Sequence, residues 1–193
     1  MTVLTNWENF YVIVGSSAGA LTGLMFVVIT LIADESRRRQ RYAGGDLAAY
    51  GTPNVVHFCA VLLLCALLSA PWESLALVGV LLGVSGLVGV AYAAIILRRI
   101  IQRSQLQGSY TPMLEDWLWF GAFPLSAYIA LAVAAVLFAT DPTPAMFVIG
   151  GAMVLLLLIG IHNAWDTVTF LAVSRNASSN TSDPGEKREG SEQ

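Results

Sequence analysis

Five long apolar segments divide this chain, and they restrict its fold more than any other feature of the sequence. A helix that crosses roughly 30 Å of hydrocarbon needs about 20 mainly apolar residues. Unbroken runs such as Val61–Leu64 and Leu155–Leu158 are typical of such helices, whereas outer-membrane strands alternate apolar and polar residues. The sequence therefore predicts an all-α integral membrane bundle of five transmembrane helices, in spans at about 10–33, 53–70, 72–97, 117–140 and 145–173.

The composition excludes two classes of protein. Charged residues make up 12% of the chain, which is about half of the share that a soluble domain carries on its wetted surface. An ordinary water-soluble enzyme is therefore excluded. The net charge of -3 offers no basic surface to phosphates, which excludes a nucleic-acid-binding protein.

Basic residues give the predicted spans a direction. With five antiparallel crossings, all ten Lys and Arg residues fall on one side of the membrane. Cytoplasmic loops collect Lys and Arg, so the sequence predicts the N-terminus outside and the C-terminus inside. Residues 1–173 form the predicted membrane domain, and the polar segment 174–193 is predicted to be a disordered cytoplasmic tail. The basic residues are Arg37, Arg38, Arg39, Arg41, Arg98, Arg99, Arg103, Arg175, Lys187 and Arg188.

Glycines recur at helical spacing in the first and third predicted spans. A strip without side chains lets another helix backbone approach closely, as in small-xxx-small motifs. Two interpretations stay open: close contacts within one five-helix bundle, or a strip that mediates self-association or lines a narrow pore. The glycines predicted to pack are Gly15, Gly19 and Gly23 in the first span and Gly79, Gly83 and Gly86 in the third.

Polar groups inside the predicted spans are the candidate site. His57 lies about one turn into the second span, and His162 and Asp166 lie one turn apart in the fifth, with Asn163 beside them. Charge is costly in a membrane, so such groups indicate either a structural hydrogen-bonded cluster or a relay for protons or ions. No catalytic set of nucleophile, base and oxyanion donors is evident. Nothing else in the sequence supports a cofactor or a metal, so none is predicted.

The segment Trp7–Val27, with the sequence WENFYVIVGSSAGALTGLMFV, resembles the first helix of a bacterial family of small multi-pass inner-membrane proteins. Some members of that family are labelled modulators of the FtsH membrane protease. Outside this segment the resemblance covers only the number of helices and the short turns. It implies a protein of the bacterial inner membrane with a regulatory or structural role.

Together these observations predict a non-enzymatic integral membrane protein that acts through helix–helix association. Its predicted partners are the lipid bilayer and either further copies of itself, as a homo-oligomer, or the other subunits of a membrane complex. The alternative is a small oligomeric ion channel or a proton-coupled transporter that uses the glycine strips and the polar cluster.

Overall fold

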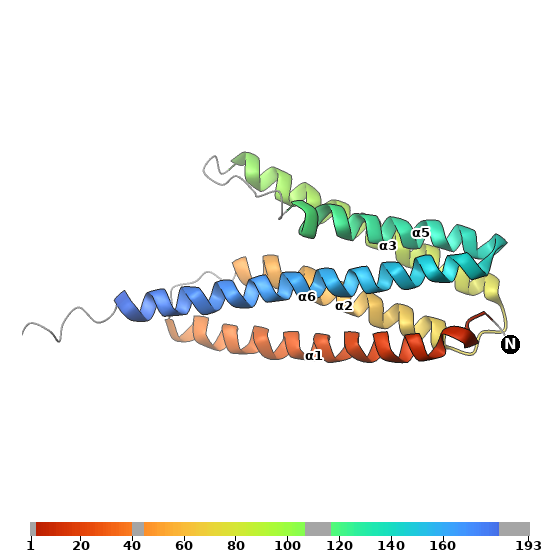
Figure 1. Cartoon of the computed structure of the whole chain (residues 1–193). Helices are drawn as coiled ribbons and strands as arrows, with labels where there is room; N and C mark the ends of the chain where they lie inside the picture. Colours follow the sequence, from red (N-terminus) through yellow and green to blue (C-terminus); the bar gives the residue numbers. More distant parts are fainter. Residues whose placement is uncertain (1–2, 40–44, 107–116, 182–193) are drawn as a thin grey trace, which may run out of the picture.

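The computed structural model describes residues 3–39, 45–106 and 117–181, and side chains over 3–30, 54–99, 101–102 and 117–169 (Figure 1). All regular secondary structure in these residues is helical. A 3-10 turn, η1, precedes the first helix, and a π-helical turn, η2, precedes α5. The elements are η1 (Thr5–Trp7), α1 (Glu8–Arg39), α2 (Gly45–Ser69), α3 (Leu75–Leu106), η2 (Leu118–Ala122), α5 (Phe123–Thr140) and α6 (Pro142–Thr181).

Four of these helical stretches are long and apolar enough to cross a membrane: Thr5–Thr30, Leu75–Arg99, Leu118–Thr140 and Pro142–Thr169. The apolar stretch of α2, Asn54–Ser69, is shorter than these four. The predicted number of long helices is confirmed, and four of them suit a multi-pass protein embedded in a membrane.

The turns are set by local chemistry. Pro71 follows α2, and Trp72 closes this turn because its Nε1–H donates to the carbonyl of Leu67. Asp141 caps α6, since its Oδ1 accepts a hydrogen bond from the backbone N–H of Thr143 at 3.2 Å. Proline is well tolerated in the first turn of a helix, so α6 begins at Pro142 rather than at the predicted residue 145.

Helix α6 also continues beyond the predicted membrane domain. It reaches Thr181, so residues 174–181 are helical where the sequence predicts disorder. These residues include no proline or glycine to end the helix. The rest of the predicted tail, 182–193, lies outside the described residues.

The helices pack in the order α1, α2, α6, α5, α3. Helix α6 is central and lies between α2 and α5, while α1 and α3 occupy opposite edges (Figure 1). Toward the left of Figure 1 the hairpin of α3 and α5 diverges from α6. The interior is apolar and includes Phe58, Met146 and Leu156, all fully buried.

The glycines of α3 pack against α5 within the chain. A Cβ atom placed on Gly86 would lie 2.6 Å from the backbone nitrogen of Ala132, so the two backbones touch there. Gly79 and Gly83 are less crowded. A Cβ placed on Gly79 or Gly83 would lie 3.6 Å or 3.5 Å, respectively, from the nearest side-chain atom. This strip lies in a close helix–helix contact inside one protomer.

The glycines of α1 are covered only in part. A Cβ on Gly15 would lie 2.9 Å from the Cβ of Cys65 on α2. At Gly19 the nearest atom, of Leu62, is 3.9 Å away, and at Gly23 nothing lies within 4 Å. The strip therefore begins in the α1–α2 contact and ends on an open surface.

Candidate functional site

His57 lies in the interior and is held by a tyrosine from another helix. Its side chain is 2% exposed, and its Nδ1 lies 2.9 Å from the hydroxyl of Tyr128 on α5. Tyr128 reaches across to α2 because its ring lies directly over Gly89 of α3, where a Cβ would collide with it. A second tyrosine, Tyr92, lies on α3, with its ring centroid 6.4 Å from that of His57. Three helices thus contribute to the surroundings of this histidine.

A narrow crevice of about 210 Å³ adjoins His57 on the side of α3 and α5. It is too narrow to admit a water molecule. Phe120, one of its wall residues, belongs to the π-helical turn η2, and Pro124 follows that turn. Proline lacks the N–H of a regular helix, and the backbone widens into a π-turn just before Pro124.

Two asparagines lie near the same depth in the bundle. Asn54 on α2 and Asn163 on α6 are both fully buried. Neither amide has a hydrogen-bond partner among the described residues, and the hydroxyl of Tyr92 has none either. Buried polar groups are nearly always paired, so this layer is unusual for a membrane interior.

His162 and Asp166 form a separate group on α6, with Trp119 of η2. The indole of Trp119 stacks on the imidazole at a centroid distance of 3.7 Å and an interplanar angle of 19°. Asp166 Oδ2 lies 3.2 Å from His162 Nε2, so the two side chains pair across one turn of α6. The Asp166 side chain is 52% exposed, so its charge is at the edge of the bundle rather than in its interior.

The four candidate polar residues therefore fall into two neighbourhoods. His162 and Asp166 meet each other, as their spacing predicts, whereas His57 lies beside Tyr128 and Tyr92. Sequence reasoning missed these two tyrosines and also missed Asn54. The spacing carried a signal for Asn54, which lies three residues before His57 and so on a neighbouring part of the same helix. No such signal links His57 to Tyr128, 71 positions away.

The chemistry of this interior site is limited to hydrogen bonding and proton exchange. Its groups are an imidazole, two phenols and two amides. Within the described residues no three His, Cys, Asp or Glu side chains come together as a metal ion requires. The arrangement can exchange a proton between His57 and the hydroxyl of Tyr128.

The fold and the site together describe an all-helical bundle with a buried polar layer and four helices long and apolar enough to cross a membrane. No family model, curated protein or solved structure matches the chain.

Proposed function

We propose that this chain is a non-enzymatic protein of a bacterial inner membrane that acts by associating with further copies of itself. In this proposal it crosses the bilayer five times, with its N-terminus outside and its C-terminus inside. The one-sided distribution of Lys and Arg supports the orientation. The resemblance of its first helix to inner-membrane proteins supports the location and a regulatory or structural role.

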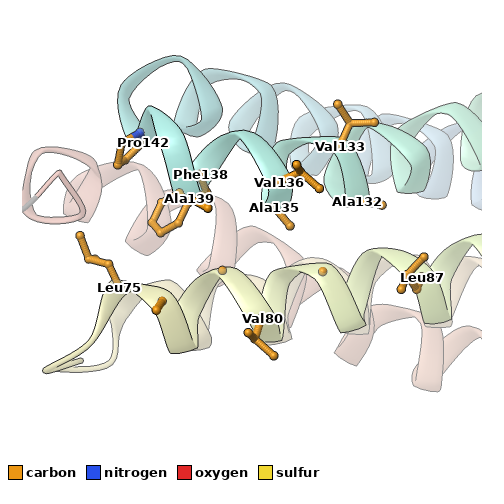
Figure 2. Close-up of a pocket in the computed structure, with 13 residues that line it drawn as sticks. Leu75, Val80, Leu87, Ala132, Val133, Ala135, Val136, Phe138, Ala139 and Pro142 are labelled. Carbon is orange, nitrogen blue, oxygen red and sulfur yellow. The ribbon is translucent and has the colours of Figure 1, made fainter.

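The observation that carries the proposal is a pair of small-residue surfaces on opposite sides of the bundle, one open along α1 and the other an apolar groove beside the α3–α5 contact. On one edge, α1 exposes Gly23 with no atom of the chain within 4 Å of an added Cβ. On the other, α3 and α5 border an apolar groove of about 800 Å³ whose wall includes Gly79, Gly83, Ala132 and Ala135 (Figure 2). In Figure 2 the groove runs from Leu75 and Pro142 at one end toward Leu87 at the other.

These two surfaces suit a head-to-tail contact. Small residues allow helices to approach closely in lipid, where apolar burial alone gives no driving force. Because the surfaces differ and lie on opposite edges, α1 of one copy would pack into the groove of the next. Repetition of such a contact closes into a ring or extends as a filament.

The test is the particle mass in lipid nanodiscs or in a mild detergent. A Cβ at position 23 meets no atom within 4 Å, so Gly23→Leu should leave the melting temperature unchanged and reduce the oligomer to protomers. Gly151→Leu is the matched control, because it also meets nothing within 4 Å but lies on the central helix α6. A wild-type protein that is monomeric, or an oligomer that survives Gly23→Leu, would contradict the proposal.

A second candidate function is ion or proton-coupled transport, and the buried layer of His57, Tyr128, Tyr92, Asn54 and Asn163 favours it. Ionisable and polar groups in a membrane interior commonly lie on ion or proton pathways. In liposomes loaded with a pH-sensitive dye, transport predicts a proton flux that is lost in His57→Gln. A flux that equals that of empty liposomes would exclude this function.

A further inference from the structure

The two buried asparagines carry an inference about what this protein binds. Asn54 and Asn163 are each 0% exposed, and both the nitrogen and the oxygen of each amide lack a hydrogen-bond partner within the described part of the chain. An unpaired buried polar group destabilises the folded state. In hydrocarbon, where no solvent is at hand, two such amides would be a large fraction of the free energy of a marginally stable bundle.

The packing of α2 on α6 brings the two asparagines to one level. The ring of Phe58 on α2 lies against Gly160 on α6 and leaves no space there for a Cβ, which fixes the faces that meet. The two helices run in opposite directions (Figure 1). Asn54 is one turn before Phe58, and Asn163 is three residues after Gly160, so both steps lead toward the same end of the bundle.

The two asparagines also share the buried faces of these helices. Residues three or four apart lie on the same side of a helix, so Asn54 is on the side of Phe58 and Asn163 on the side of Gly160. Complete burial of both side chains agrees with this placement. They therefore flank the α2–α6 interface from its two sides.

The chemistry of two facing amides selects the ligand. Each amide offers two N–H donors and one carbonyl oxygen, and neither carries a charge. A neutral ligand needs no counter-charge, whereas these two side chains offer none to an ion buried in an apolar interior. A ligand that both donates and accepts, is neutral, and is small enough for a packed helix interface is water, which takes two to four polar partners when it is buried.

We propose that Asn54 and Asn163 bind water at the α2–α6 interface and so form a hydrated site in the interior of the bundle. Water there donates to the carbonyl oxygens and accepts from the N–H groups. His57 lies within one turn of Asn54, so the hydrated site would place a proton-exchanging molecule near the histidine. The proposal is independent of how copies of the chain associate.

Water-edited solid-state NMR of the ¹⁵N-labelled protein in lipid bilayers tests the proposal directly. We expect the side-chain Nδ2 signals of Asn54 and Asn163, assigned through the backbone, to gain intensity from water protons at short mixing times. The exposed Asn9 is the positive control. The backbone N–H signal of the fully buried Ala134 should gain no intensity from water protons. If the Nδ2 signals of both asparagines gain no more intensity than the Ala134 signal, the water site is refuted, whether or not the two amides bond to each other.

A second measurement uses thermal unfolding of Asn54→Leu, Asn163→Leu and the double variant. If water joins the amides, each single substitution leaves the other amide with an incomplete set of partners and lowers the melting temperature. The double variant should then melt higher than the sum of the two single shifts predicts. Two single variants that each melt above the wild type, with additive shifts, would show that the amides have no bound partner to lose.

Discussion

Gly86→Ala tests a close backbone contact between α3 and α5 through the addition of a single methyl group. The new Cβ would lie 2.6 Å from the nitrogen, 2.9 Å from the Cα and 3.1 Å from the Cβ of Ala132. Favourable non-bonded distances between heavy atoms are about 3.5–4.0 Å, so the overlap is about 1 Å. Two of the three atoms belong to the backbone of α5, and no side-chain rotation can relieve the collision. The helices must separate locally.

The expected magnitude is the difference between two opposing terms. Overpacking of this kind costs about 1–3 kcal/mol. Replacement of glycine by alanine inside a helix returns about 0.5–1 kcal/mol. We expect a net loss of about 1–2 kcal/mol, which corresponds to a melting temperature about 2–8 °C lower for a chain of this size.

Gly83→Ala is the control on the same helix and toward the same neighbour. Its Cβ would lie 3.5 Å from the Cβ of Ala135, which is an ordinary contact. The variant should melt at the wild-type temperature or slightly above it, because the gain in helix propensity meets no collision. Tryptophan fluorescence during heating, in one detergent at one protein concentration, measures both shifts. Equal melting temperatures for Gly86→Ala and Gly83→Ala would refute the close α3–α5 contact.

Three further predictions concern the polar groups and the orientation. Tyr128→Phe removes the hydroxyl that pairs with His57 and should lower the free energy of unfolding by about 1–3 kcal/mol. Tyr92→Phe removes an unpaired hydroxyl and should be neutral or stabilising. Equal shifts of the melting temperature in the two variants would contradict this assignment. Asp166→Asn should cost less than about 1 kcal/mol in the same assay, because the carboxylate is half exposed. In a variant without the native cysteines, a cysteine at residue 143 should react with an impermeant thiol reagent from outside intact cells and one at residue 44 should not; the reverse pattern would invert the orientation.

The helices and turns were predictable because their causes are local. Long apolar runs set the helices, and Pro71 and Asp141 with Pro142 set two of the turns. Each signal is contained in a few consecutive residues. The end of α6 was placed too early, because a polar composition indicates disorder while the same residues, free of proline and glycine, continue a helix that is already formed.

The partners of the helices were not predictable in the same way. Periodicity showed that α1 and α3 each have a glycine face, but it contains no information about which neighbour a face meets. The structure places Gly86 against Ala132 and Gly15 against Cys65, and both contacts join residues far apart in the sequence. The same limit applies to His57, whose hydrogen-bond partner on α5 follows from the position of Gly89 under the Tyr128 ring.

The two proposed surfaces and the polar layer lie in different parts of the bundle, and this separation makes the candidate functions distinguishable. Gly23 is on an outer edge, whereas His57 and Asn163 are buried among the central helices. A protein that works by association should respond to Gly23→Leu and tolerate changes at His57 that leave its stability intact. A transporter whose pathway lies within each protomer should show the opposite pattern, with flux retained in Gly23→Leu and lost in His57→Gln. If both substitutions abolish flux, the pathway depends on the assembled copies, and the edge and the interior then belong to one function.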